Sequence, residues 1–265
     1  MNVSGTVPPE GSPARTVGPL DVLVAVETLR FLLSYLPEAP ARVLEVGCGR
    51  GDLASLLMGE GYDVTAVDAC ADAVAHAGAL GIDAHVANWP DFPADGSTVA
   101  PFDAILFSRS LHHIAPLDAA LVRVEELLVP AGRLLVEDFA VERMEPDPIA
   151  WFRETARPLQ ERKLIADDEA CLGVRLLRQD DALERWKAEH RDLLDAQTIL
   201  AEIGRRFDLR HAEDAPYLFR FLAPALQGNV GGFDALVRFI TKETHAIGDG
   251  RLTPVGRRYV ALRRD

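Results

Sequence analysis

Short apolar runs alternate with amphipathic stretches between about residue 20 and residue 140. Apolar positions at helical spacing predict a covering helix over residues 20–36. Short runs rich in Val, Ile and Leu are typical of buried strands, and glycines mark the ends of several segments between them. Regular alternation of this kind predicts a parallel sheet with helices on both faces. The predicted strands are 43–46, 64–67, 82–87, 102–107 and 133–137, separated by helices at 52–59, 69–80 and 117–128.

The rhythm changes after residue 140. Residues 141–205 are mostly charged and helical in period, with helices predicted at 182–194 and 196–207. A sixth strand is predicted at 209–212, and a last strand at 255–263. A chain that ends on two strands predicts an antiparallel edge on the otherwise parallel sheet. We therefore expect a doubly wound, mostly parallel seven-stranded α/β sheet with a helical lid insertion. The expected divisions are a flexible leader at 1–19, an α/β core at 20–140, the lid at 141–205, and completion of the sheet at 206–265.

Composition narrows the class of protein. A chain of 265 residues with 48% hydrophobic residues suits one α/β domain with a full core. It has no apolar run of the roughly 20 residues that span a bilayer, and its first 19 residues lack the apolar stretch of a signal peptide. The net charge of −13 disfavours nucleic acid as a partner. The basic residues near the C-terminus alternate with apolar ones, which indicates a strand rather than a nucleic-acid site.

The cysteines indicate the compartment. Cys48, Cys70 and Cys171 are odd in number and lack the spacing of metal ligands. A reduced, cytoplasmic location fits this usage. We expect no metal site and no membrane partner.

The most informative segment is VLEVGCGRGDL at residues 43–53. A glycine turn between the first strand and the first helix lies where open α/β sheets bind ligands. A dinucleotide fingerprint would require glycine at position 52, where this chain has Asp52. An aspartate in the first helical turn disfavours a pyrophosphate there, because both groups are anionic. The turn therefore favours a nucleoside without phosphates and disfavours a nicotinamide oxidoreductase.

Two acidic residues flank this turn. Glu45 lies on the strand before it and suits an ammonium or sulfonium group, and Asp68 ends the second strand, where a carboxylate can accept hydrogen bonds from ribose hydroxyls. An adenosine with a cationic amino-acid tail describes S-adenosylmethionine. The alternative is structural: Gly49 and Gly51 would serve a tight turn, and Asp68 would cap a helix.

With these residues, the chain resembles the class I, seven-stranded, Rossmann-like S-adenosylmethionine-dependent methyltransferases of the small-molecule type. The resemblance covers roughly residues 40–140. It implies that the methionine end of the cofactor lies on the glycine turn and that Asp68 takes the ribose. At the adenine end, Asn88 stands where the family usually has Asp, and its amide oxygen can still accept a hydrogen bond. The residues implied to bind the cofactor are Glu45, Gly47, Cys48, Gly49, Gly51, Asp68, Ala69, Asn88, Trp89 and Ser108.

The sequence SLHHI at residues 110–114 resembles an element of many bacterial small-molecule methyltransferases. A histidine near the transferred methyl group can accept a proton from the acceptor, since its pKa lies near neutrality. We expect His113 rather than His112 to do so, with His112 turned toward helix 117–128. Either histidine could instead fix the loop, and methyl transfer can proceed by proximity alone.

Other residues are candidates for the substrate side. Arg109 follows the fourth strand, and Glu137 and Asp138 end the fifth, where they either face the substrate or are solvated charges. Trp151 in the insertion and Tyr217 could reach an apolar substrate, but packing explains both aromatic residues as well.

The expected function is transfer of a methyl group from S-adenosylmethionine to the oxygen, nitrogen or carbon atom of a small molecule, with S-adenosylhomocysteine as the product. The setting could be specialised metabolism, and the protein a monomer or homodimer. One alternative is a peptide or protein methyltransferase, which needs an open groove. Another is a protein that binds the cofactor without methylating.

Overall fold

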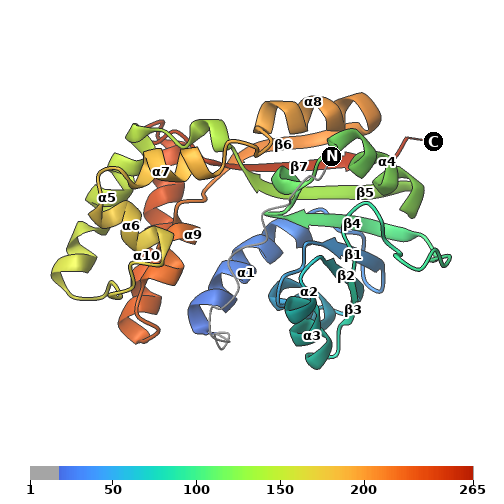
Figure 1. Cartoon of the computed structure of the whole chain (residues 1–265), viewed down its shortest axis with the longest axis horizontal. Helices are drawn as coiled ribbons and strands as arrows, with labels where there is room; N and C mark the ends of the chain where they lie inside the picture. The colour runs from blue at the N-terminus through green and yellow to red at the C-terminus, as the bar shows by residue number, and fades with distance from the viewer. Residues whose placement is uncertain (1–17, 265) are drawn as a thin grey trace.

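The architecture is a single twisted sheet with helices on both faces and a second helical layer at one end (Figure 1). Figure 1 shows the computed structural model, which describes residues 18–264. Most of the expected leader lies outside the described residues. The strand order is β3-β2-β1-β4-β5-β7-β6. The strands are β1 Arg42–Val46, β2 Asp63–Asp68, β3 Asp83–Val86, β4 Phe102–Ser108, β5 Leu128–Phe139, β6 Asp208–Ala215 and β7 Gly256–Leu262.

The first five strands are parallel, and β7 pairs antiparallel with both β5 and β6. The predicted fold class is therefore confirmed. The helices are α1 Pro19–Leu33, α2 Asp52–Gly59, α3 Ala71–Ala79, α4 Leu117–Leu127, α5 Pro146–Glu161, α6 Leu172–Arg178, α7 Ala182–Glu189, α8 Ala196–Arg206, α9 Phe219–Leu222 and α10 Val230–Gly248, with short 3₁₀ turns η1 Leu111–His113, η2 Val141–Arg143 and η3 Ala223–Ala225.

Consecutive residues of the central strands pack on opposite faces of the sheet. Val43 of β1 belongs to the apolar cluster with α1, α2 and α3, whereas Leu44 belongs to the cluster with α4 and α8. Both faces are covered, which explains why these strands are continuous apolar runs in the sequence. None of the described helices has the length and apolar character needed to span a bilayer.

Three element boundaries differ from the sequence expectation. Strand β5 begins at Leu128 instead of 133, because the segment Pro130-Ala131-Gly132 forms an irregularity in the pairing with β4 rather than a loop. Helix α7 ends at Glu189, not at 194. Strand β6 is longer than expected. Most of its residues are charged or exposed, so the sequence does not show the alternation that marks a strand.

The second helical layer is assembled from two segments of the chain. Helices α5, α6 and α7 share an apolar cluster with α9, α10 and the beginning of α1. Helix α8, in contrast, packs against the sheet beside α4 through Ile199 and Ile203. The packing groups therefore do not follow the expected division at residue 205.

Candidate active site

A cavity of about 300 Å³ opens at the carboxyl ends of β1 and β4. Its walls come from α1, from most of residues 45–53, from Ser108 and Arg109, and from Arg220 with the adjoining η3. Loops at the carboxyl edge of a parallel sheet are where such folds bind ligands. The cavity therefore brings part of the predicted cofactor set together with one predicted substrate residue.

The glycine turn has left-handed backbone at its three glycines, with φ of +77° at Gly47, +53° at Gly49 and +85° at Gly51. A Cβ on Gly47 would lie 2.4 Å from the Cβ of Ser110, whose hydroxyl donates to the Val46 carbonyl at 2.6 Å. At Gly49 a Cβ would meet nothing within 4 Å. Gly47 is thus explained by packing, whereas Gly49 keeps space open beside the cavity that it lines.

Asp68 ties the end of β2 to this turn. Its Oδ2 accepts the Gly49 N–H at 2.8 Å and its Oδ1 accepts the Cys70 N–H at 2.9 Å. Asp68 therefore shapes the backbone, as the structural alternative supposed. It is not itself the cap of a helix, because the N-cap of α3 is Cys70, two residues further on. Each carboxylate oxygen retains a further acceptor site, so the ribose role stays a prediction. The neighbouring Ala69 is exposed.

Glu45 is the buried acid of the cavity, with 2% of its surface exposed. Its Oε2 has no hydrogen-bond partner among residues 18–264. Burial raises the pKa of Glu45 to about 8; Arg109 opposes this shift, and the negative charge of Asp52 adds to it. The ligand-free carboxyl therefore holds its proton at pH 7, and a cationic ligand beside Oε2 would favour the carboxylate form.

Three arginines line the cavity: Arg50 in the glycine turn, Arg109 after β4, and Arg220. Arg109 has a φ of +60°, which is unusual for a residue with a side chain, and its N–H donates to the Glu137 carbonyl at 2.8 Å. Arg220 comes from α9 and is 7% exposed. Its Nη2 donates to Glu137 Oε2 at 2.5 Å and to Thr28 Oγ1 at 2.9 Å.

Glu137 is fully engaged in this network. Arg258 donates to its Oε1 at 2.9 Å, and Thr28 donates to its Oε2 at 2.6 Å. Burial alone would raise the pKa of Glu137, but the positive charges of Arg220 and Arg258 hold that pKa below its ordinary value. Glu137 is neither solvated nor free to bind a substrate directly, and its observed contacts instead position Arg220.

His112 and Asp138 form a buried pair. The His112 ring Nδ1 lies 2.5 Å from Asp138 Oδ1, and the His112 backbone N–H donates to Asp138 Oδ2 at 3.0 Å. His112 therefore turns toward β5, whereas the sequence analysis expected it to turn toward the helix at 117–128. The reason is that η1 aims both its N–H and its ring at one carboxylate. That carboxylate favours the tautomer with hydrogen on Nδ1, which leaves Nε2 as an acceptor.

His113 lies beside this pair, with its ring centre 4.0 Å from that of His112. It is more exposed than His112. Burial, and then the nearby His112, lower the pKa of His113 to about 4. His113 is therefore neutral at pH 7.

An aromatic wall adjoins the histidines. Phe139 at the end of β5 contacts the His112 ring edge-on at 4.7 Å and stacks on Tyr217 at 5.1 Å. Trp186 lies 5.9 Å from Phe139 and stacks on His190 at 4.8 Å. Burial raises the pKa of the Tyr217 hydroxyl, which is thus protonated. The wall joins β5 to α7 and to the start of α9.

Comparison with known proteins decides the family. A family model described as "Methyltransferase domain" matches residues 23–209. This chain belongs to the methyltransferase domain family. The predicted family is confirmed, since the matched region contains the glycine turn, both histidines and β5.

Relatives of this methyltransferase-domain chain include the ubiquinone biosynthesis O-methyltransferase of Xylella fastidiosa (strain 9a5c). The two are 34% identical over 127 residues, which is 45% of this chain and 51% of the relative. The malonyl-[acyl-carrier protein] O-methyltransferase of Enterobacter lignolyticus (strain SCF1) is 28% identical over 176 residues, 65% of this chain and 68% of the relative. The chain spans about half the length of the first of these curated relatives.

Solved structures share the fold at low identity. The N-methyltransferase NodS from Bradyrhizobium japonicum WM9, in complex with S-adenosylhomocysteine, has a TM-score of 0.51 and 14% identity over 94% of this chain and 89% of its own. The geranyl diphosphate C-methyltransferase from Streptomyces coelicolor A3(2) has a TM-score of 0.55 and 14% identity over 96% and 86%. These likenesses support the fold.

Several predicted residues of this methyltransferase-domain chain lie away from the cavity. Asn88 is exposed after β3, and Trp89 is buried, donating its Nε1–H to the Ala120 carbonyl at 3.1 Å. Trp151 packs edge-on against Phe239 of α10, in agreement with the packing alternative given for it in the sequence analysis. Ser108 and Cys48 line the cavity as expected from the resemblance.

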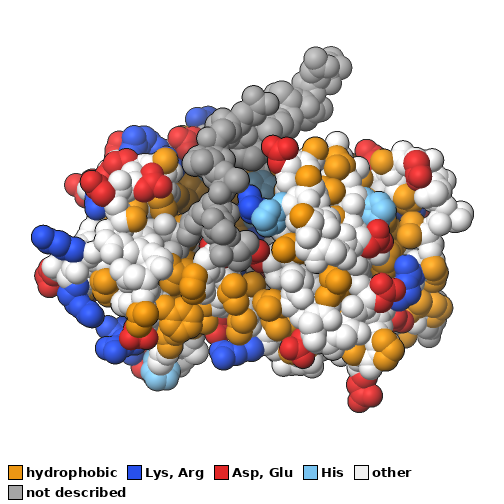
Figure 2. All heavy atoms as spheres, turned by 90° about the horizontal axis from the view of Figure 1, so that it is seen from below, with side chains coloured by type: hydrophobic (Ala, Val, Ile, Leu, Met, Phe, Trp, Pro, Cys, Tyr) orange, Lys and Arg blue, Asp and Glu red, His pale blue; other side chains and the backbone are white. Residues whose placement is uncertain are grey.

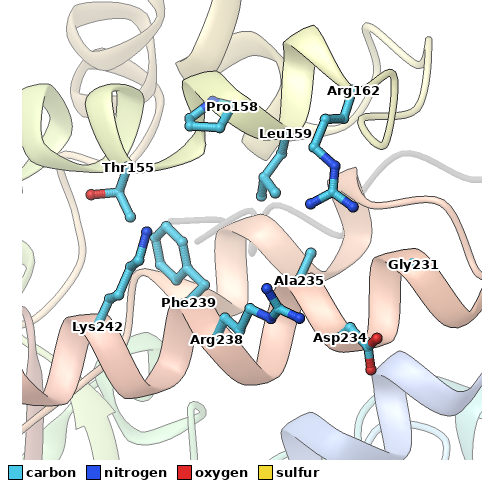
Figure 3. Close-up of a pocket in the computed structure, with 10 residues that line it drawn as sticks. All are labelled: Thr155, Pro158, Leu159, Arg162, Gly231, Asp234, Ala235, Arg238, Phe239 and Lys242. Carbon is cyan, nitrogen blue, oxygen red and sulfur yellow. The ribbon is translucent and has the colours of Figure 1, made fainter.

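A second cavity lies between α5 and α10 (Figure 3). It has a volume of about 160 Å³, and Figure 3 shows the side chains of Arg162 and Arg238 reaching toward the space between the two helices. None of the predicted site residues lines it.

Proposed function

We propose that the chain transfers a methyl group from S-adenosylmethionine to a small-molecule acceptor. The observation that carries the proposal is the free oxygen of buried Glu45, at the cavity edge of a glycine turn. A carboxylate in that position suits the cationic amino-acid end of the cofactor, and the open space at Gly49 admits a ligand close to the backbone. The residues present fit the cofactor that the family implies.

Glu45 and Asp68 have distinct tasks in this proposal. Glu45 Oε2 accepts a hydrogen bond from the ammonium group, and the spare acceptor sites of Asp68 take the ribose hydroxyls. The cofactor, when bound, supplies an electrophilic methyl group on a sulfonium. The surrounding protein orients the two reactants and excludes water, which accounts for a large share of rate enhancement in such displacements.

On the acceptor side, we propose that His112 takes the proton and that His113 contacts the acceptor. Asp138 orients the His112 ring and stabilises the charge that forms when Nε2 accepts a proton, as a buried carboxylate does in other histidine pairs. His113 has no such partner and is a weak base because of its low pKa. This revises the sequence expectation, which favoured His113 as the base.

The acceptor class follows from the walls of the site. Helix α9 and η3 close the cavity opposite the glycine turn, and the aromatic wall around Phe139 suits a small, partly apolar acceptor. Two curated relatives are named as methylating oxygen in ubiquinone biosynthesis and in malonyl-[acyl-carrier protein]. We propose an oxygen acceptor as the first class to test.

The experiment has a binding arm and a turnover arm. Calorimetry should give a Kd for S-adenosylhomocysteine in the micromolar range or tighter, about −8 kcal/mol, with far weaker binding of NAD. Mass spectrometry of reactions with S-adenosylmethionine and a panel of phenols, carboxylic acids and amines should detect a methylated product. Equal affinity for NAD would overturn the cofactor assignment. Tight cofactor binding without any methylated product would favour a binding protein.

A further inference from the structure

Arg220 is a buried cation with unused donors. Its Nε and Nη1 have no hydrogen-bond partner among the described residues, although its Nη2 is bonded to Glu137 and Thr28. Buried donors of a charged group are seldom left unpaired, because the loss of water is not compensated. Arg220 also lines the cavity that contains Glu45. A ligand in the cavity is the natural partner for these donors.

The charges around Arg220 leave room for an anion. Arg220 and Arg258 share Glu137, and Arg258 also pairs with Glu213, whereas Arg109 forms no ion pair with any residue in the described range 18–264. Burial lowers the pKa of Arg220; Glu137 opposes that shift, and the positive charge of Arg109 adds to it. Arg220 and Arg109 are like charges that face one cavity, and an anion bound between them would offset their repulsion.

The acids that line the cavity are Asp21 on α1, Glu45 on β1 and Asp52 at the start of α2. The carboxylate that pairs with Arg220 is Glu137, which does not line the cavity. Arg109 has one of the largest electrostatic effects on both Glu45 and Arg220, so it links the acidic and the basic side chains of the cavity.

The backbone that carries Arg220 is held in place. Glu243 of α10 is fully buried and accepts the N–H groups of Tyr217, Leu218 and Phe219 at 2.6, 2.7 and 3.0 Å. The residues just before Arg220 therefore cannot move away without breaking three hydrogen bonds. Such preorganisation is typical of a binding residue rather than of a mobile surface arginine.

We propose that Arg220, with Arg109, is the receptor for a carboxylate in this cavity. A guanidinium suits a carboxylate because its donors are planar and permanently charged, while the carboxylate only accepts. The carboxylate comes either from the amino-acid end of the cofactor or from an acidic acceptor. The first source rests on the proposed function, and the second requires only the cavity.

Two ligands separate these sources from a structural effect. S-adenosylhomocysteine has the amino-acid end, and 5′-methylthioadenosine lacks it. If the cofactor supplies the carboxylate, calorimetry should show that Arg220→Gln lowers the affinity for S-adenosylhomocysteine at least tenfold. The affinity for 5′-methylthioadenosine should fall less than twofold. Arg220→Lys, which keeps the charge, recovers part of the loss. Arg109→Gln gives a smaller loss with the same selectivity.

Arg258→Gln is the matched control. It removes the second guanidinium that contacts Glu137. Arg258 does not line the cavity, so the ratio of the two affinities should remain unchanged. The third probe is malonate, a dicarboxylate, titrated into protein saturated with S-adenosylhomocysteine. If malonate binding is lost in Arg220→Gln while both nucleoside affinities are kept, the carboxylate belongs to the acceptor.

The proposal is overturned if Arg220→Gln weakens both nucleosides equally, or if it changes none of the three affinities. Melting curves of the ligand-free variants identify a protein that has failed to fold, and Arg109→Gln then carries the test. Should the wild-type protein bind neither nucleoside, the proposed function fails, but loss of malonate binding in Arg220→Gln still tests the receptor on its own.

Discussion

The two sides of the cavity are built in different ways. On the side of the glycine turn, Glu45, Gly47 and Gly49 lie within a few residues of one another in a single strand and turn. On the side of Arg220, the contacts join residues far apart, since Arg220 is 83 positions from Glu137 and 192 from Thr28. The comparison teaches that the side of Glu45 is a local property of the chain, whereas the side of Arg220 exists only after the sheet, α1 and α9 have assembled.

The largest expected effect is at His112, which pairs with Asp138 of β5, 26 residues further along the chain. His112→Gln should lower turnover by about 10²- to 10⁴-fold, the usual contribution of a general base, and leave cofactor affinity nearly unchanged. Asp138→Asn should reduce turnover in the same direction by favouring the wrong tautomer. His113→Gln is the control and should cost less. If His113→Gln costs more than His112→Gln, the base has been assigned to the wrong histidine.

A second effect concerns Glu45 and pH. The folded carboxyl holds its proton up to about pH 8, whereas the ordinary value is 4.5. Between these values the folded state binds more protons than the unfolded state, so stability falls as pH rises, by at most roughly 1.4 kcal/mol per unit. Denaturant unfolding of the ligand-free protein from pH 5 to pH 8 should show this loss. Glu45→Gln should flatten the profile, and an identical slope in that variant would refute the assignment.

Two alanine substitutions in the turn should behave differently. Gly47→Ala forces a Cβ against Ser110 in addition to left-handed strain, and should lower the free energy of unfolding by about 2 to 3 kcal/mol. Gly49→Ala meets no neighbour and should cost only about 1 to 2 kcal/mol. Gly49→Ala should nevertheless reduce the affinity for S-adenosylhomocysteine by more than the loss in the free energy of unfolding explains. Equal effects of the two variants on affinity would mean that Gly49 does not face the ligand.

The smallest expected effect is at Asp68. Asp68→Ala should weaken S-adenosylhomocysteine about tenfold, since hydrogen bonds to a charged acceptor contribute roughly 1.5 to 3 kcal/mol. It also removes the bonds to Gly49 and Cys70, so thermal melting must accompany the calorimetry. Asp72→Ala, an exposed acid on α3, is the control. Unchanged affinity in Asp68→Ala would leave Asp68 as a support of the turn alone.

Much of the fold could be predicted because the evidence for it is local. Each parallel strand is buried on both faces and therefore appears as an apolar run, and glycine turns mark the helix ends. The β5 boundary could not be predicted, because Pro130 and Gly132 are typical of a loop but here lie in an irregular strand pairing. Strand β6 was placed too short for the opposite reason, since its charged residues suppress the pattern.

The candidate site divides in the same manner. Glu45 and the glycine turn were identified because their spacing carries chemistry. Arg220 was missed because it lies in a stretch of alternating aromatic residues that indicates only packing. Phe139 was missed as well, although its position at the carboxyl end of a strand is a usable signal. The alternatives for Trp151 and Glu137 could not be separated from the sequence, because their partners, Phe239 and Arg220, come from the other end of the chain.

Neighbouring residues of β5 serve different networks. Glu137 contacts α1 and Arg220, while Asp138 contacts His112 in the turn that precedes α4, because successive side chains of a strand point to opposite faces. Pairing with β7 places Glu137 opposite Arg258 and Asp138 opposite Arg257. A slip of β7 by one residue in that pairing would exchange the two arginines between the faces. The register of the C-terminal strand therefore keeps Arg258 on the face of the sheet where Glu137 meets Arg220.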